Sequence, residues 1–268
     1  MIINKFLRFM NKESALLLDS FRFTPKNQQK HVTIKYETLT PMQALEKIRE
    51  MRTEKNAPVD LIGSHLQPMK NIDDDSKGFQ LLVSLILSVQ TKDQTTDLVM
   101  NRLKEKGLSV DFLDKIDQED LKKLIFEINF NNNKAKYLKN LASIVKNDYN
   151  YKMPTDYNEV LKFPGVGHKI AVLYMQHHLN QTVGIAVDTH VHRISNRLEW
   201  VETKTPNQTM SQLEKIFDKE IWKEINELLV GFGQTICLPI NPKCEECLLK
   251  DACPEKKKLV QKKKRIKK

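Results

Sequence analysis

Apolar residues recur at the spacing of amphipathic helices along most of the chain. Between positions 41 and 53, Ala44, Leu45, Ile48 and Met51 repeat every three or four residues, as one face of a helix does. No segment alternates apolar and polar residues over the length of a strand, so the pattern predicts an all-α protein. Further helices are predicted over 93–106, 118–128, 134–148, 156–162, 168–179, 188–198, 207–218 and 220–232.

One predicted helix, over 78–90, is apolar almost all round. A helix with so little polar face belongs at the centre of a bundle. Residues 56–76 are rich in Pro, Asp, Gly and Asn and predict a loop. Residues 1–38 have no sustained period and predict a disordered tail. The apolar positions of the central helix are Phe79, Leu82, Val83, Leu85, Ile86, Leu87 and Val89.

The net charge of +10 comes almost entirely from the carboxyl end of the chain. Residues 256–268 hold nine Lys or Arg and no acid, so the remaining chain is close to neutral. A basic tail of this kind, over 255–268, suits nuclear import or phosphate contact, or it only adds solubility. The longest apolar run, 81–89, is too short to span a membrane.

The amino-terminal residues carry a weak mitochondrial-presequence pattern. Four basic residues lie among apolar ones in the first 24 positions, but Glu13 and Asp19 oppose them. The alternative is a disordered amino terminus without a targeting role.

All four cysteines of the chain fall in one short stretch. Cys237, Cys244, Cys247 and Cys253 have the spacing C-x6-C-x2-C-x5-C, close enough for four thiolates to surround one metal centre. Two disulfides would suit a small secreted domain, which this chain does not resemble. A structural zinc site usually has two Cys-x-x-Cys pairs, and here there is one, so the spacing favours an iron–sulfur cluster over zinc.

A Pro-Gly-x-Gly turn is predicted between two helices. Pro164, Gly165 and Gly167 make a tight connection, and glycines let backbone N–H groups approach a ligand closely. The helix that begins there would direct its unpaired amides and positive dipole end outward, which suits a phosphate. An ordinary connection between helices is the alternative, and for this turn taken alone it is the better one.

Lys169 and Asp188 are candidates for chemistry. Lys169 lies in the first turn of the predicted helix, where the positive dipole end favours a neutral, nucleophilic amine able to form a Schiff base. A surface lysine contacting phosphate is the other interpretation. Asp188 stands at a helix start and could cap it, assist the lysine, or do both. His190 and His192 have no third ligand nearby and are interpreted as packing or polar-contact residues.

Five motifs in this order resemble the endonuclease III family of the helix-hairpin-helix DNA glycosylase superfamily, and are most similar to its eukaryotic endonuclease III-like members. Together they cover about residues 40–254. Phe163 departs from the usual leucine before the hairpin, which does not threaten the chemistry. The motifs are Leu-Ser-Val-Gln-Thr-Lys-Asp (87–93), Pro-Gly-Val-Gly-His-Lys (164–169), Ala-Val-Asp-Thr-His-Val-His-Arg (186–193), Gly-Phe-Gly-Gln (231–234) and the cysteine run.

The resemblance implies two helical domains with DNA bound in the cleft between them. Residues 73–181 would form a six-helix barrel with the helix-hairpin-helix at about 154–180. Residues 39–72 and 182–254 would together form a domain that carries the iron–sulfur cluster loop.

The resemblance also implies roles for individual residues. Lys169 would attack the sugar C1′ of a damaged nucleotide with Asp188 beside it, and Gln90 and Phe130 would enter the duplex where the base has left. The hairpin residues Pro164, Gly165, Gly167 and His168 would contact DNA. The four cysteines, Cys237, Cys244, Cys247 and Cys253, would bind a [4Fe–4S] cluster.

The implied activity is that of a bifunctional DNA glycosylase and AP lyase of base excision repair. Its partner would be double-stranded DNA with oxidised pyrimidines or abasic sites, acted on by a monomer in the nucleus, with the mitochondrion as a second location. Two other classes compete with this interpretation: a non-catalytic hairpin module that binds DNA, and an interaction protein stabilised by zinc.

Overall fold

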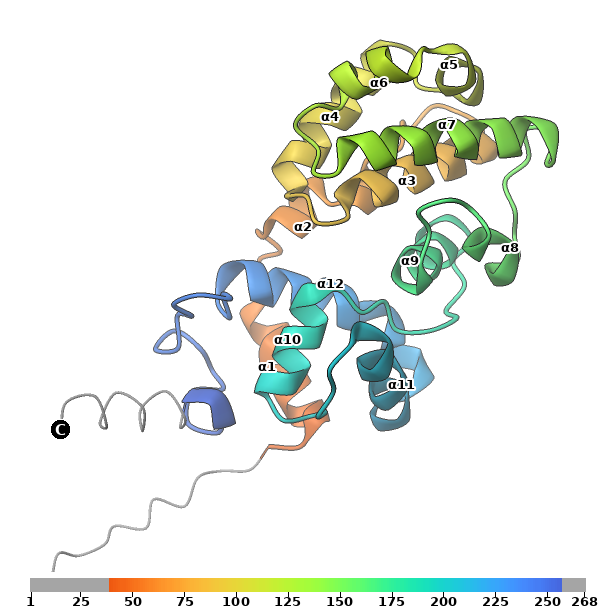
Figure 1. The fold of residues 1–268 in the computed structure, drawn as a ribbon. Coiled ribbons are helices and arrows are strands. Elements are labelled where there is room, and N and C mark those ends of the chain that lie inside the picture. Colours follow the sequence, from red (N-terminus) through yellow and green to blue (C-terminus); the bar gives the residue numbers. More distant parts are fainter. Residues whose placement is uncertain (1–38, 257–268) are drawn as a thin grey trace, which may run out of the picture. The chain divides into compact units, whose positions relative to one another are not determined.

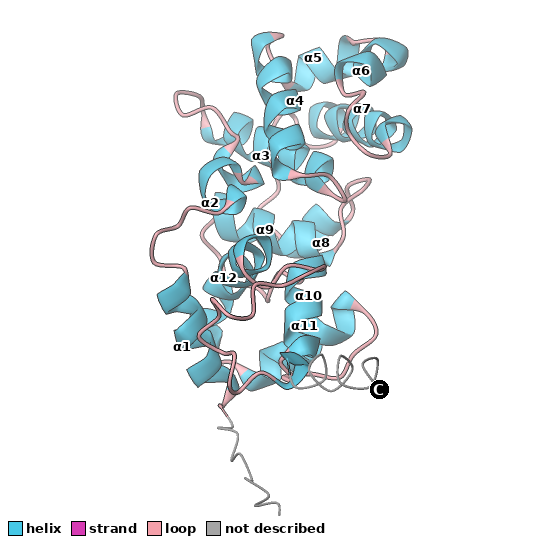
Figure 2. Cartoon of the chain, turned by 90° about the vertical axis from the view of Figure 1, so that its left-hand side faces the viewer, coloured by secondary structure: helices cyan, strands magenta, loops and turns pink. Residues whose placement is uncertain are grey.

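A computed structural model describes residues 39–256, and these residues form helices and no strand (Figures 1 and 2). This confirms the all-α prediction. The tail predictions for 1–38 and most of 255–268, with the presequence pattern, lie outside the described residues. No helix of the described part is long and apolar enough to cross a membrane. The elements are α1 (Pro41–Met51), α2 (Pro58–Ile62), η3 (Ser64–Leu66), α3 (Asp74–Ser88), α4 (Asp93–Glu105), α5 (Val110–Lys115), α6 (Gln118–Leu124), α7 (Asn131–Asn147), α8 (Tyr157–Leu161), α9 (His168–His178), α10 (Thr189–Arg197), α11 (Pro206–Ile216), η4 (Lys219–Ile221) and α12 (Trp222–Thr235).

The central helix α3 differs from its predicted bounds at both ends. It starts at Asp74, because Asp73 caps it by accepting a hydrogen bond from the backbone N–H of Ser76 at 2.9 Å. It ends at Ser88, so Gln90 lies beyond the helix and not at its last turn as predicted. Gln90 has φ 53°, the left-handed conformation that a continuing helix cannot contain.

The prediction of a continuous loop over 56–76 is wrong, because this segment contains α2 and η3. Asp60 makes the short helix α2 possible: its carboxylate accepts from the backbone N–H of Ala57 at 2.8 Å and forms an ion pair with Arg52 at 2.6 Å. Both side chains of the pair are buried, with 4% and 3% of their surfaces exposed. Helix α5 was also missed; Ser109 caps it through the N–H of Phe112.

A first hydrophobic cluster surrounds α3, in which every residue from Gly78 to Leu87 is buried. Its contributors run along the chain from Phe79 to Ala186 and include the apolar faces of α4, α7 and α9, all of which contact α3. The nearly continuous apolar sequence of α3 is therefore explained by neighbours on several sides (Figure 1).

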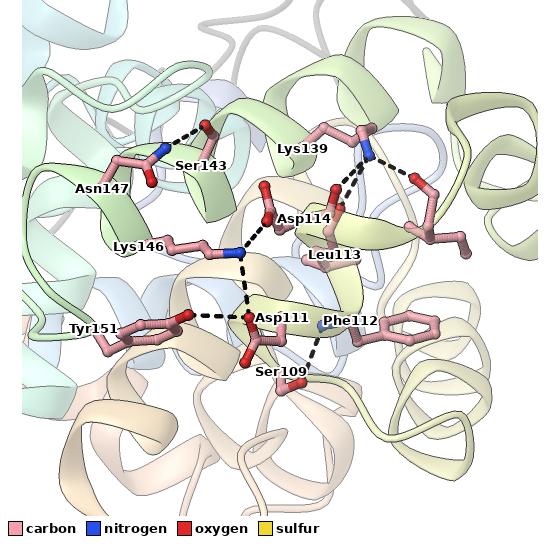
Figure 3. Close-up of polar contacts among 11 residues, drawn as sticks. Ser109, Asp111, Phe112, Leu113, Asp114, Lys139, Ser143, Lys146, Asn147 and Tyr151 are labelled. Carbon is pink, nitrogen blue, oxygen red and sulfur yellow. Dashed lines mark hydrogen bonds and ion pairs between the residues drawn. The ribbon is translucent and has the colours of Figure 1, made fainter.

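Helix α7 is tied to the end of α5 by a lysine. The Lys139 ammonium donates to the backbone carbonyls of Leu113, Asp114 and Ile116, which lie at the C-terminal end of α5 (Figure 3). These carbonyls have no partner within the helix, and a cation is favourable at this end of the helix dipole. About two turns further along α7, Lys146 forms ion pairs with Asp111 and Asp114 of α5 (Figure 3).

A second hydrophobic cluster is built from α1, α10, α11 and α12. Leu45 and Ile48 of α1 meet Ile225 and Leu229 of α12 in this cluster, so an early and a late part of the chain share one core. Three of the four cysteines pack against its edge.

The two clusters are joined through α2 and α12. Helix α2 contacts both α4 and α12. The side chain of Gln234 on α12 accepts from the backbone N–H of Val59 at 3.0 Å and donates to Asp93 at 2.7 Å. Gln234 therefore connects α2, α4 and α12 at one point, beside the cleft described next.

Candidate active site

The hairpin between α8 and α9 requires glycine at position 165. Gly165 has φ 80°, and a Cβ added there would lie 2.6 Å from a ring carbon of Tyr137. Both the left-handed backbone and the contact with Tyr137 exclude larger residues. Asp156 caps α8 by accepting hydrogen bonds from two backbone N–H groups, which fixes the helix on the other side of the turn.

In the described part of the chain, no side chain caps the amides in the first turn of α9. Its N-cap is Gly167, whose φ of −109° is ordinary extended backbone and which has no atom within 4 Å of an added Cβ. The open amides and the positive dipole end of α9 can therefore accept an anion. His168 stands exposed next to them, and its Nδ1 hydrogen bonds to the hydroxyl of Tyr157 at 2.7 Å.

Lys169, in the same first turn of α9, is half-buried and lines a cleft with a volume of about 850 Å³. Its ammonium has no ion-pair or hydrogen-bond partner in the part of the chain that the structure describes. An amine without a protein partner at the wall of a cleft is available to a bound molecule.

Asp188 lines the same cleft and is the N-cap of α10. One carboxylate oxygen accepts a hydrogen bond from the backbone N–H of Val191 at 2.8 Å, so the predicted capping role is present. The side chain is half-buried, so the carboxyl group lies at the cleft wall. The structure thus brings together the two residues singled out for chemistry from two different helices.

The charges of Lys169 and Asp188 both act on the pKa of His190. Burial lowers the pKa of its imidazole, while the charge of Asp188 acts to raise that pKa and the charge of Lys169 to lower it. The Nδ1 of His190 lies 3.2 Å from the guanidinium of Arg193, which can only donate, so this nitrogen accepts. The contact agrees with the interpretation of His190 as a polar-contact residue. His192 contacts the hydroxyl of Thr209 at 2.7 Å.

Gln90 also lines the cleft, whereas Phe130 and the hairpin residues do not. Phe130 is exposed over 63% of its surface and has φ 59°. It stands next to Asn129, which does line the cleft and whose side-chain amide donates to the backbone carbonyl of Gln90. Pro164, Gly165 and Gly167 lie on the turn that leads into α9, and His168 is the first residue of that helix; none of the four lines the cleft.

Several polar residues of the cleft belong to no motif of the sequence. His65 of η3 and His177 of α9 stack with their ring centroids 4.7 Å apart, and Gln176 donates to the carbonyl of Lys223 at 2.7 Å. No motif in the chain marks these positions, because they meet only after folding. Gln234 does have a sequence signal, since it ends the Gly-Phe-Gly-Gln motif.

The four cysteines line one separate cavity of about 30 Å³, together with apolar residues that include Phe232 and Leu249. All four thiols are half-buried. Burial raises the pKa of the Cys237 and Cys244 thiols, and raises that of Cys247 to about 11. Within residues 39–256, no group of three or more His, Cys, Asp or Glu side chains is arranged to hold a metal ion.

The surroundings of the cysteines fit a thiolate-bound group. The guanidinium of Arg197 lies 3.5 Å from Cys237 Sγ, and the backbone N–H of Leu249 lies 3.4 Å from Cys247 Sγ. N–H groups directed at sulfur stabilise thiolates that bind iron. Arg193 and Arg197 of α10 also donate to backbone carbonyls of this loop, so α10 joins Asp188 to the cysteines.

Comparisons with known proteins point in one direction. Residues 83–219 match the family described as HhH-GPD superfamily base excision DNA repair protein. The chain is 46% identical to Endonuclease III-like protein 1 of Gallus gallus, over 83% of this chain and 80% of that one. It is 38% identical to the Endonuclease III homolog of Encephalitozoon cuniculi, over 80% of this chain and 94% of that one. A solved structure of a trapped endonuclease III–DNA covalent intermediate has a TM-score of 0.72 and 29% identity, and covers 83% of this chain and all (100%) of its own.

Proposed function

The chain belongs to the endonuclease III family of base-excision DNA repair enzymes, and we propose that it is a glycosylase that also nicks DNA through a lysine Schiff base. It is a DNA glycosylase of base excision repair. The observation that carries the lyase proposal is the cleft that Lys169 and Asp188 both line, with no protein partner on the Lys169 ammonium among the described residues.

In the proposed reaction, Lys169 is the nucleophile. The lone pair of its neutral Nζ attacks C1′ of the damaged nucleotide, and the glycosidic bond breaks with its electron pair leaving on the base. The sugar ring opens to a Schiff base between C1′ and Nζ. Loss of a proton from C2′ then expels the 3′ phosphate, so the strand is nicked 3′ to the abasic site by β-elimination.

Asp188 assists as a fixed charge beside the reacting carbon. Its carboxylate can accept the proton that Lys169 must lose and can stabilise the positive charge that develops on the sugar. The hydrogen bond from the N–H of Val191 holds this carboxylate in position, so capping and catalysis use the same side chain.

The DNA contacts proposed from the sequence are compatible with this chemistry. The open first turn of α9, at Gly167 and His168, would bind a phosphate of the damaged strand. Gln90, on the rim of the cleft, would enter the duplex where the flipped base has left, and Phe130 would enter nearby.

We propose further that Cys237, Cys244, Cys247 and Cys253 hold a [4Fe–4S] cluster. When bound, the cluster supplies a structural link that fixes this loop; the base-excision chemistry needs no electron transfer. Support comes from the shared cavity and from the N–H groups directed at two of the sulfurs. The purified protein is expected to be brown, with an absorption band at about 400 nm. A colourless, folded protein containing zinc would refute the cluster.

The remaining assignments follow from the family and are proposed with it. We expect a nuclear monomer that acts on oxidised pyrimidines and abasic sites in duplex DNA, with the mitochondrion as a second location. The division into a barrel domain, 73–181, and a cluster domain, 39–72 with 182–254, is supported by the two hydrophobic clusters, which divide the chain in nearly the same way.

Borohydride trapping on duplex DNA with a thymine glycol or an abasic site tests the lyase proposal. A covalent protein–DNA band is expected with wild type and not with Lys169→Ala, because only a Schiff base is reduced to a stable bond. Lys162→Ala removes an exposed lysine of the same hairpin and should leave the band unchanged. Full trapping by Lys169→Ala would assign the nucleophile elsewhere, and intact DNA binding without any band would leave a non-catalytic hairpin protein.

A further inference from the structure

The turn that carries Gln90 connects α3 to α4 and is strained. Gln90 is exposed and has φ 53°, in the left-handed region that residues other than glycine seldom adopt. Such a conformation is unfavourable and persists only when the surroundings fix it. The contacts around this turn must therefore hold Gln90 in this conformation.

A buried lysine lies inside the turn. Lys134, in the first turns of α7, is only 4% exposed, and its Nζ donates to the carbonyls of Leu87 at 2.9 Å and Val89 at 2.5 Å. A third hydrogen bond reaches the hydroxyl of Thr91 at 3.2 Å. An ammonium has three N–H donors, so all three are used, on residues that flank Gln90 on both sides.

Among residues 39–256, no carboxylate binds this buried ammonium. Burial lowers the pKa of Lys134 to about 8, with no neighbouring charge contributing, so its partners are neutral oxygen atoms. The carbonyls of Leu87 and Val89 lie at the C-terminal end of α3, where the helix dipole favours a cation. At neutral pH the ammonium remains protonated and keeps its three donors.

The same segment also holds Phe130. The side-chain amide of Asn129 donates to the carbonyl of Gln90, and the backbone N–H of Lys134 donates to the carbonyl of Phe130 at 3.0 Å. Residues 129–134 therefore fix the backbone at Gln90 and at Phe130 together. One set of hydrogen bonds from this segment therefore holds the backbone that carries the two exposed side chains.

We propose that Lys134 is a positioning residue for base extrusion: its ammonium fixes the turn of residues 88–91, so that Gln90 is already presented, beside Phe130, when the damaged base leaves the duplex. The inference rests on the proposed function, in which these two side chains enter the DNA. Lys134 touches neither the base nor the sugar in this scheme and acts through Gln90.

The test compares Lys134→Met with Lys139→Met. Both changes keep the apolar stem and remove an ammonium from α7 that donates to carbonyls at a helix C-terminus. The Lys139 ammonium, however, binds carbonyls at the end of α5 (Figure 3), and neither Lys139 nor α5 lines the cleft. Excision of thymine glycol from a fully paired duplex requires extrusion of a base. β-Elimination at a preformed abasic site has no base to extrude, so it measures the lysine chemistry alone.

For Lys134→Met we expect the single-turnover rate on paired thymine glycol to fall about tenfold or more, since small misplacements of positioning groups have effects of that order. Elimination at the abasic site should change less than about threefold. The fluorescence of a 2-aminopurine next to the lesion, which rises when the stack is opened, should lose most of its increase. Lys139→Met should leave the ratio of the two rates and the fluorescence as in wild type.

An equal fall of both rates for Lys134→Met, or a ratio shared with Lys139→Met, would overturn the positioning role. Should Lys134→Met fail to fold, Asn129→Ala removes only an exposed side chain that binds the carbonyl of Gln90, and the same change in ratio is expected. An unchanged ratio for Asn129→Ala would then refute the proposal. A wild-type protein without activity on either substrate would instead reject the proposed function.

Discussion

At the scale of single residues, Asp188 has two roles that substitution can separate. Asn keeps an oxygen able to accept from the N–H of Val191 and loses the negative charge, whereas Ala loses both. Asp188→Asn is therefore expected to fold with wild-type stability and to lose about 100-fold or more in single-turnover excision. Asp188→Ala should lose activity similarly and also about 1 kcal/mol of stability.

Urea unfolding followed by circular dichroism, with excision rates on the same preparations, measures both effects. Equal stability of the Asn and Ala variants would show that the cap contributes nothing. Wild-type excision by Asp188→Asn would remove Asp188 from the chemistry.

His177 makes stability depend on pH. Burial, followed by the charges of His65 and Lys223, lowers the pKa of His177 to about 4. An unfolded histidine takes up its proton near pH 6.5, so between about pH 6.5 and pH 4 the unfolded chain binds more protons than the folded one. Stability is therefore lost as the pH falls through this window.

His177→Gln should remove that part of the pH dependence. From pH 7 to pH 5 the variant is expected to lose about 1 kcal/mol less free energy of unfolding than wild type, after allowance for partial exposure to solvent. Urea midpoints at the two pH values measure the difference. An equal loss of stability between the two pH values in both proteins would show that His177 does not cause this pH dependence.

At the scale of elements, the two hairpin glycines are needed for different reasons. Gly165→Ala forces a methyl group against Tyr137 at φ 80° and should cost about 1–3 kcal/mol of stability. A methyl group added at Gly167 would have no described atom within 4 Å, and the backbone there is ordinary extended chain. The stability of Gly167→Ala should therefore stay within about 0.5 kcal/mol of wild type. Its methyl group, however, stands at the open amides of α9 and should weaken DNA binding.

Chemical unfolding and fluorescence anisotropy on an abasic-site duplex distinguish the pair. Wild-type affinity for Gly167→Ala would argue against a phosphate at the start of α9. Wild-type stability for Gly165→Ala would mean that the turn and Tyr137 rearrange without cost.

At the scale of the whole molecule, the buried ion pair of Arg52 and Asp60 ties the amino-terminal helices to the carboxyl-terminal one. Arg52 crosses Gly231 of α12 so closely that a Cβ there would lie 2.2 Å from the guanidinium carbon. Arg52→Met leaves the Asp60 carboxylate buried without its cation and should cost about 3–5 kcal/mol.

The double variant Arg52→Met with Asp60→Asn removes the uncompensated charge and should be more stable than Arg52→Met alone. Thermal and urea unfolding of the three proteins measure this. A double variant less stable than the single one would contradict this account, since Asn keeps an oxygen able to accept from the N–H of Ala57 and removes only the charge.

The sequence predicted those features of the fold that depend on local residue patterns. The apolar run of α3 indicated a central helix, and the glycine turn before Lys169 located the start of α9. It could not predict α2, whose five residues depend on Asp60 bonding to Arg52, nor the left-handed conformation of Gln90, which tertiary contacts impose. Lys134 looks like any surface lysine in the sequence, and only folding shows that it is buried.

The fixed turn around Gln90 also bears on how fast damage can be found. A repair protein meets a very large number of intact base pairs for each lesion, and any loop that must become ordered at every encounter slows each inspection. Here Lys134 and Asn129 already hold that turn in the free protein. The time spent at an undamaged base pair then depends on how readily the bases of the DNA leave the stack, and not on the ordering of a protein loop.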